Sequence, residues 1–184
     1  MTLLSDSPHD RVMVFIDLRN VLKSSEIPGL DLPLDLYRLS LDMAGGRRLV
    51  AAYVFDTRAP YGEEDRAHRM HDRLRFLGFR VVARESYDPS RREQKEVDVA
   101  MGCEMVAHAL KDNFDVAVVV SGDRDFVPAI QHVQSAGKRV EVAAFHEAFS
   151  KEMLKSCDRY RMLDSVPLLR MDGPAAGGAG GDGA

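Results

Sequence analysis

The chain lacks most features of secreted and membrane proteins. Its 184 residues include two cysteines, Cys103 and Cys157, which cannot form a disulfide framework and are expected to be reduced, partly buried thiols. No stretch approaches the roughly 18 uninterrupted apolar residues that a membrane-spanning helix needs. Residues 1–10 show no basic start followed by an apolar run, so we expect no secretory signal. We therefore expect a cytoplasmic protein without a membrane partner.

Excess positive charge is also missing, since the formal net charge is −4. This balance argues against a protein that coats nucleic acid by bulk electrostatics, but it permits a nucleic-acid enzyme with a local basic rim. The motifs GxGxxG, GxxxxGK[ST] and GxSxG are absent, so dinucleotide, P-loop and serine-hydrolase functions have no support. His68 and His71 share a helix face but lack further ligands, so we expect structural or surface roles for them.

The hydrophobic pattern predicts the fold. With 45% hydrophobic and 29% charged residues, the chain is expected to form one globular domain with a real core. Near-continuous apolar runs, typical of a parallel sheet covered on both faces, predict strands at 12–16, 49–55, 79–83, 116–120 and 140–145, with a small edge strand at 161–163. Helical patterns lie between them at 33–44, 63–77, 97–111, 126–136 and 150–157. This alternation predicts an α/β doubly wound domain.

Composition also predicts the domain boundaries. We expect a flexible N-terminus over residues 1–10 and the folded domain over 11–166. Residues 167–184 are rich in Gly and Ala and lack large apolar side chains near their end, so we expect a disordered tail unless a partner orders it.

Acidic residues follow two of the predicted strands. Asp17 comes directly after the first strand, and Asp123 and Asp125 follow the strand at 116–120 and a Ser121-Gly122 turn. In open parallel sheets ligands bind outside the carboxyl ends of the strands, near the point where strand order reverses. If the two strands are neighbours, their carboxylates therefore converge. The alternative is that each Asp caps the next helix or turn.

Asp98 lies at the start of an amphipathic stretch, after a segment rich in Arg and Lys that we expect to be a loop. It either forms an acidic first turn favoured by the helix dipole or points towards the other carboxylates. Glu104 lies six residues further on, off the face of Asp98 on a regular helix, so we expect a supporting role for it rather than direct metal ligation. If Asp98 points towards the other carboxylates, a cationic rim for phosphates would consist of Arg84, Arg91, Arg92 and Lys95.

Carboxylates gathered in this way repel one another unless a cation lies between them. Their hard oxygen ligands favour magnesium or manganese. Asn20, three residues after Asp17, either orients a carboxylate, a water or a phosphate, or caps a helix that starts at Val21. Ser121 is expected to hydrogen-bond a carboxylate or a phosphate.

With these residues identified, the chain resembles the NYN family of PIN-like ribonuclease domains, in particular its LabA-like (DUF88) branch. Two departures from the family pattern are Leu18-Arg19, where the family often has Gly, and Glu104, where many members carry Asp. The matching segments follow family order over about 12–163 and are Phe15-Ile16-Asp17-x-x-Asn20, Lys95-x-Val97-Asp98-Val99, Val119-Val120-Ser121-Gly122-Asp123-x-Asp125-Phe126-x-Pro128 and Gly137-Lys138-x-Val140.

The resemblance implies a PIN-like, Rossmannoid fold, which is a three-layer α/β/α sandwich with a mainly parallel central sheet. It also implies that acidic residues hold Mg²⁺ or Mn²⁺ for hydrolysis of RNA phosphodiester bonds, with Asn20 as their polar companion. Carried over by position, the expected catalytic and metal-binding residues are Asp17, Asp98, Asp123 and Asp125.

The leading hypothesis is thus a metal-dependent ribonuclease, which at an open strand-end site favours single-stranded RNA. A non-catalytic RNA-binding or regulatory module is the alternative, supported by the moderate charge and the lack of an obvious aromatic platform. An aspartyl-phosphate phosphatase would use Asp17 as nucleophile, but Arg19 stands where such enzymes need a second Asp. The sequence leaves the number of metal ions and a homo-oligomer or protein partner open. Expected substrate contacts come from Asn20, Ser121, Arg91, Arg92, Lys95 and Arg124.

Overall fold

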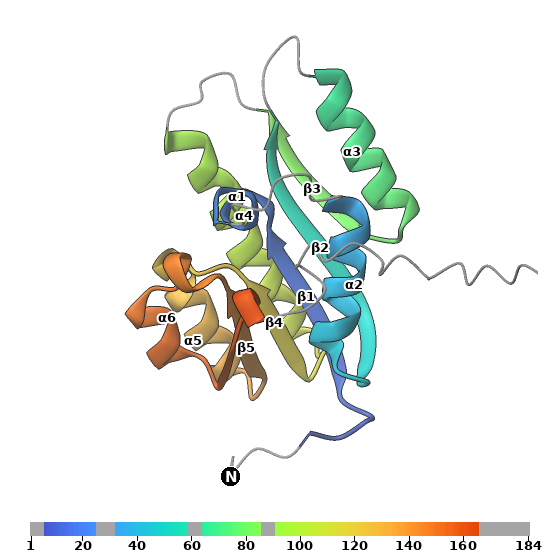
Figure 1. Ribbon diagram of the computed structural model, residues 1–184. Helices are drawn as coiled ribbons and strands as arrows, with labels where there is room; N and C mark the ends of the chain where they lie inside the picture. Colours follow the sequence, from blue (N-terminus) through green and yellow to red (C-terminus); the bar gives the residue numbers. More distant parts are fainter. Residues whose placement is uncertain (1–5, 25–31, 59–63, 86–90, 166–184) are drawn as a thin grey trace, which may run out of the picture.

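The computed structural model describes residues 6–24, 32–58, 64–85 and 91–165. These residues form a six-stranded sheet in the order β3-β2-β1-β4-β5-β6, with every neighbouring pair parallel (Figure 1). The predicted parallel sheet is confirmed. The strands are β1 (Arg11–Asp17), β2 (Arg48–Arg58), β3 (Arg80–Glu85), β4 (Val116–Val120), β5 (Arg139–Ala144) and β6 (Arg159–Met162).

Helices cover both faces of the sheet, as the predicted α/β/α sandwich requires. On one face lie α1 (Leu18–Ser24), α2 (Leu32–Ala44) and α3 (Glu64–Phe76). On the other lie α4 (Arg91–Leu110), α5 (Val127–Ser135) and α6 (Lys151–Ser156). Short 3₁₀ turns complete the chain as η1 (Arg124–Phe126), η2 (His146–Ala148) and η3 (Leu163–Ser165).

The strand β1 shows why its sequence is apolar throughout. Val14 and Ile16 pack with the core under α1–α3, whereas Met13 and Phe15 pack with the core under α4–α6. Successive side chains of a strand point to opposite faces, so a strand covered on both sides needs an apolar residue at every position. This central position also fixes the place of the residue that ends β1.

The chain changes direction across the sheet at β1. From β1 it proceeds to β2 and β3 on one side, and then returns through α4 to β4 on the other side. Because β1 and β4 are paired, with Ile16 opposite Val120, Asp17 lies beside Ser121. The strands β1 and β4 are therefore neighbours, which is the condition for their terminal carboxylates to converge, and they meet at the point where strand order reverses.

Two helices begin earlier than predicted. The helix α4 starts at Arg91, so the predicted loop before Asp98 is wrong, and Asp98 lies about two turns into the helix. Arg, Glu, Gln and Lys, which make up residues 91–96, are all good helix formers, and this propensity outweighs their charge. The helix α1 starts at Leu18, directly after β1, and not at Val21.

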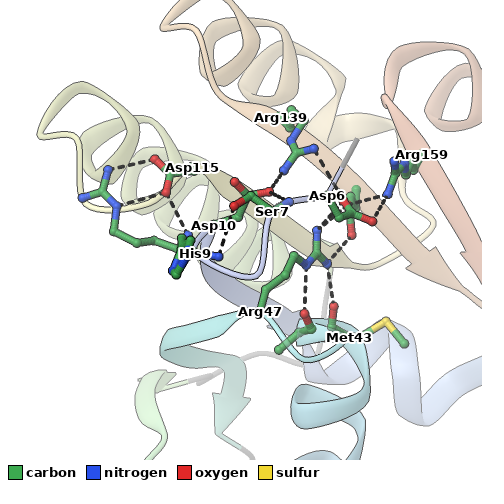
Figure 2. A network of polar contacts seen from close by, with 12 residues as sticks. Asp6, Ser7, His9, Asp10, Met43, Arg47, Asp115, Arg139 and Arg159 are labelled. Carbon is green, nitrogen blue, oxygen red and sulfur yellow. Dashed lines mark hydrogen bonds and ion pairs between the residues drawn. The ribbon is translucent and has the colours of Figure 1, made fainter. Parts of the chain in front are cut away.

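A network of ion pairs lies at the amino ends of the strands, which we call the amino edge of the sheet (Figure 2). Arg47, whose side chain is 7% exposed, donates to both carboxylate oxygens of Glu141 at 2.7 and 2.9 Å. It also donates to the Met43 carbonyl oxygen at 2.9 Å. Asp6 pairs with Arg159 at 2.6 Å, and Asp10 pairs with Arg139. The segment that precedes β1 is thereby attached to β5 and β6.

Several predictions concern the ends and the cysteines of the chain. The predicted start of the domain at residue 11 stays a prediction, although Asp6 and Asp10 make the contacts just described. The predicted tail at 167–184 lies outside the described residues. Both cysteines are free thiols, but Cys103 is exposed on α4, so its predicted partial burial is wrong. Within the described part of the chain, no helix is long and apolar enough to cross a membrane.

The ion pair between Arg47 and Glu141 provides a test of the amino edge. Replacing Arg47 by Met should lower the free energy of unfolding by about 3 kcal/mol, because Glu141 would stay largely buried and keep only its longer contact with Arg159, at 3.9 Å. The double variant Arg47→Met/Glu141→Leu should recover most of this loss, since it leaves no unpaired charge. Urea denaturation of the three proteins measures both effects, and a single variant as stable as the wild type would contradict the argument.

Candidate active site

Asp17 links the two central strand ends. It is 4% exposed, and its Oδ1 accepts the backbone N–H of Asn20 at 3.0 Å. Its Oδ2 accepts the hydroxyl of Ser121, the first residue after β4, at 3.1 Å. The contact with Asn20 is that of a helix N-cap, so Asp17 both starts α1 and faces the strand-order reversal. The two interpretations of this residue are therefore compatible.

The loop after β4 is held by a chain of hydrogen bonds. Asn20 Oδ1 accepts the Gly122 N–H at 3.2 Å, and Ser121 Oγ accepts the Asp123 N–H at 3.2 Å. Asp123 Oδ1 in turn accepts the Asp125 N–H at 3.0 Å and caps η1. Each polar side chain thus orients the backbone that carries the next carboxylate.

Two residues predicted to contact substrate have other partners. Asn20 lies inside α1, so the alternative that it caps a helix is wrong; its amide oxygen positions the loop after β4. Ser121 is 1% exposed and donates to Asp17, which is the carboxylate contact of its two predicted partners. Both side chains therefore support the acids, and the burial of Ser121 argues against contact of its hydroxyl with RNA.

Gly122 is required by the packing of this loop. A Cβ built on it would lie 2.0 Å from the carbonyl oxygen of Ala148 and 2.5 Å from the carbonyl carbon. The Gly122 carbonyl accepts the N–H of Ser150 at 3.1 Å. The loop after β4 is thus pressed against the segment between η2 and α6, and a side chain at this position would displace it.

Asp98 approaches this region from α4. Burial is the main cause that raises its pKa to about 7, followed by repulsion from Asp17, Asp123 and Asp125. Burial also raises the pKa of Asp17, and the hydrogen bonds from Asn20 and Ser121 oppose that shift. We call these four carboxylates the acidic centre. The structure brings the four predicted acids within electrostatic reach of one another.

The acidic centre fits a divalent cation in chemistry. Carboxylate oxygens are the donors that magnesium and manganese prefer, and a cation would remove the repulsion that raises the pKa of Asp98. Within the described residues, however, no three His, Cys, Asp or Glu side chains are grouped closely enough to hold an ion as they lie. Asp125 is exposed and Asp123 is half-buried, so these two have room to change rotamer.

The predicted cations differ in position. Lys95 and Arg124 are exposed and line the same hollow as Asp98 and Asp125. Arg91 and Arg92 belong to the first turn of α4, but their side chains lie outside the described residues.

Glu104 contacts a histidine of its own helix. Its carboxylate is 3.4 Å from His108 Nε2, one turn further along α4. It lines a second hollow together with Arg84 and Lys95. The angular offset from Asp98 on a regular helix agrees with the expectation that Glu104 is not a direct ligand, and its supporting role stays a prediction.

A neighbouring buried cluster was not predicted from the sequence. Asp56, near the end of β2, is 3% exposed, and its Oδ2 lies 2.8 Å from Nε2 of the fully buried His71. Arg19 donates to Asp56 Oδ1 at 3.1 Å and to the Thr57 carbonyl at 2.7 Å. The signal for Asp56 was available, since it ends an apolar run just as Asp17 does. The structural role expected for His71 is confirmed, and a surface role is excluded.

Comparisons with known proteins agree with this fold. The family model described as "NYN domain" matches residues 11–164. A crystal structure of a Vibrio parahaemolyticus protein of unknown function is similar, with a TM-score of 0.67 and 20% sequence identity. The similarity covers 88% of this chain and 98% of that one, and at this identity it shows the fold alone. No curated protein matches the sequence.

Substitution of Gly122 tests the packing of the loop after β4. Gly122→Ala should lower the free energy of unfolding by about 1–3 kcal/mol, because the new Cβ meets backbone atoms of Ala148 that cannot move cheaply. Gly102→Ala is a matched control, since its Cβ would meet only the Cβ of Ala129, at 3.4 Å. Urea denaturation should separate the two variants, and equal stabilities would contradict the packing argument.

The raised pKa of Asp98 predicts how stability depends on pH. Its folded-state pKa of about 7 exceeds the usual value, so the folded protein binds the proton more tightly, and stability falls as the pH rises from about 4 to about 7. In chelator, Asp98→Asn should therefore melt higher than wild type at pH 8, by about 2–4 °C for each kcal/mol, and by less at pH 5.

The control for this experiment is Asp72→Asn, which changes an exposed carboxylate on α3 and should give the same small difference at both pH values. Adding Mn²⁺ at pH 8 should raise the melting temperature of the wild type more than that of Asp98→Asn. If the difference in melting temperature between Asp98→Asn and the wild type were independent of pH, the argument from a raised pKa of Asp98 would be wrong.

Proposed function

The chain belongs to the NYN domain family, whose fold is of the PIN-like nuclease type, and from this premise we propose that it is a metal-dependent ribonuclease. The observation that carries the proposal is the gathering of four carboxylates where strand order reverses, at a site where burial, and after it repulsion from the other three acids, raises the pKa of Asp98 to about 7. Such mutual repulsion lowers the stability of the folded protein without a structural benefit. Carboxyl groups with pKa values perturbed in this way cluster at functional sites.

Nucleases of this fold typically use divalent metal ions, and Asp17, Asp98 and Asp123 would hold magnesium or manganese here. When bound, the ion supplies Lewis-acid polarisation of the phosphate and a water of lowered pKa. Asp17 is the fixed member of the set, because Ser121 and the Asn20 backbone hold its two oxygens. Asp125, which is exposed, would be a further ligand or would orient the attacking water.

The surroundings of the acidic centre support RNA as the substrate. Lys95 and Arg124 are exposed beside Asp98 and Asp125, where they can neutralise phosphates on either side of the scissile bond. The carboxyl edge of the sheet is an open site, which suits a flexible single strand better than a rigid duplex. Binding should therefore weaken as salt concentration rises.

A second function is favoured by one observation. Because the described acids do not form a ready three-ligand group, the protein can instead be a module that binds RNA without cutting it. Incubation of RNA with manganese or with chelator separates the two functions. Fragments that form only with manganese support the enzyme, whereas retained but intact RNA supports the binding module.

Replacement of single acids tests catalysis. Asp17→Asn and Asp123→Asn should each lower manganese-dependent cleavage of single-stranded RNA by at least about 100-fold, because a metal ligand supplies several kcal/mol of transition-state stabilisation. Circular dichroism should show an unchanged fold, since Asn at position 17 can accept the Asn20 N–H through its oxygen and donate its NH2 group to Ser121 Oγ, and Asn at position 123 can still accept the Asp125 N–H. Asp72→Asn, on an exposed part of α3, is the control and should cleave normally. Wild-type rates in both active-site variants would refute the proposal.

A further inference from the structure

A large groove opens beside the acidic centre, between α4 and α5. Its volume is about 980 Å³, and Asp98 and Asp125 form part of its wall. Sites for small organic ligands usually measure about 300–1,000 Å³, so this groove has room for more than one flat ring. The apolar part of its lining includes Val99, Cys103, Val106, Pro128 and Ala129.

Small residues at the base of the groove bring the two helices together. A Cβ on Gly102 would lie 3.4 Å from the Cβ of Ala129, so α4 and α5 approach closely at this point. Above it, α4 exposes a stripe of apolar side chains at helical spacing, from Val99, which is 64% exposed, to Leu110, which is 73% exposed. Exposed apolar side chains that line a hollow indicate a contact surface.

Most of the charged residues that line the groove adjoin one region of α4, and the exception is Glu152 on α6. Lys95, Asp98 and Val99 belong to one region of α4, and Arg124 and Asp125 adjoin it from η1. Further along α4 the lining residues are Val106, Ala107 and Leu110, which carry no charge. The groove thus offers a charged region and a long apolar region in one continuous hollow.

A single-stranded nucleic acid has the same division of charge. Each nucleotide joins a charged phosphate to a flat base whose faces are weakly hydrated, so a phosphate at the acidic centre places its neighbouring bases near the apolar region. A protein helix over the whole groove would instead bury Asp98 and Asp125 away from water, which is costly for charges without partners. The observations therefore favour nucleic acid over protein as occupant.

We propose that this groove binds the unstacked bases of single-stranded RNA next to the scissile phosphodiester. The inference rests on the proposed function and extends it to the choice of substrate. Apolar contact and stacking tolerate every base, so the groove selects for unpaired bases and not for sequence. Arg124, exposed at the charged end, offers a guanidinium plane on which a base can stack. Paired bases in a duplex cannot enter.

The exposed thiol of Cys103 allows the native protein to be blocked at the groove. We would alkylate it with N-cyclohexylmaleimide, which is bulky and uncharged, and confirm the single adduct by mass spectrometry. Binding of a fluorescein-labelled single-stranded RNA is then measured by anisotropy, with calcium present and a gel to show that the RNA stays whole. Alkylation should weaken binding by about tenfold or more, the effect of losing one stacked base.

Two controls make the result specific. Cys157→Ser changes a partly buried thiol outside the groove, so this variant should bind RNA as the wild type does and lose binding on alkylation to the same extent, which assigns the effect to Cys103. An RNA of the same length with abasic residues keeps every phosphate, so it should bind the unmodified protein weakly and be little affected by alkylation.

Each outcome decides a different question. Unchanged binding after alkylation, or equally tight binding of abasic RNA, overturns the groove as a base site while leaving cleavage untouched. Base-dependent binding that alkylation abolishes, without cleavage in manganese, supports the groove and refutes the ribonuclease. A dimer that alkylation splits while RNA affinity stays constant would show that the groove joins two copies of the chain, which also overturns the inference.

Discussion

Repulsion between carboxylates at the ends of β1 and β4 is the constraint around which this domain is arranged. The pKa values of carboxyl groups are shifted in opposite directions at the amino and carboxyl ends of the strands. At the amino edge, hydrogen bonds and charge from Arg11 lower the pKa of Asp115 to about 2, and Arg159 lowers the pKa of Asp6. At the carboxyl edge, burial and like charges raise the pKa of Asp98 to about 7. Ion pairs thus stabilise the fold at the amino ends of the strands, whereas the carboxylates at the carboxyl ends carry an electrostatic cost.

The sequence was sufficient to predict the layers of the fold but not all element boundaries. The strands β1 to β5 could be located because each contains an apolar run, and β4 was predicted at its observed bounds, Val116–Val120. The start of α4 was not, because a charged segment without apolar periodicity looks like a loop, although its residues favour helix. The parallel order followed from the alternation of elements, whereas the register of β1 against β4 became known only from the structure.

For the candidate site, residues that directly follow strands could be predicted, whereas contacts between residues far apart in the sequence could not. Asp17 and Asp123 could be identified from their positions alone, but the hydrogen bond from Gly122 to Asn20 joins residues 102 positions apart. The supporting role of Glu104 stays a prediction, because its place along α4 does not tell which neighbour its flexible side chain meets. Asp56 and His71 form a pair that required knowledge of how α3 packs on β2. The predicted side-chain contacts of Arg91 and Arg92 stay predictions.

The hydrogen bond between Ser121 and Asp17 has a consequence for how the protein is made. It joins residues 104 positions apart, and β4 follows β2 in the chain only after α3, β3 and α4. During synthesis, the edge of β1 that pairs with β4 therefore stays unpaired until most of the domain has left the ribosome. Such long-range parallel pairing is slow to form and leaves an adhesive strand edge exposed meanwhile. The carboxyl ends of β1 and β4, where the acidic centre lies, are accordingly among the last parts to be assembled, and a prematurely terminated chain would expose an unpaired strand without a complete acidic centre.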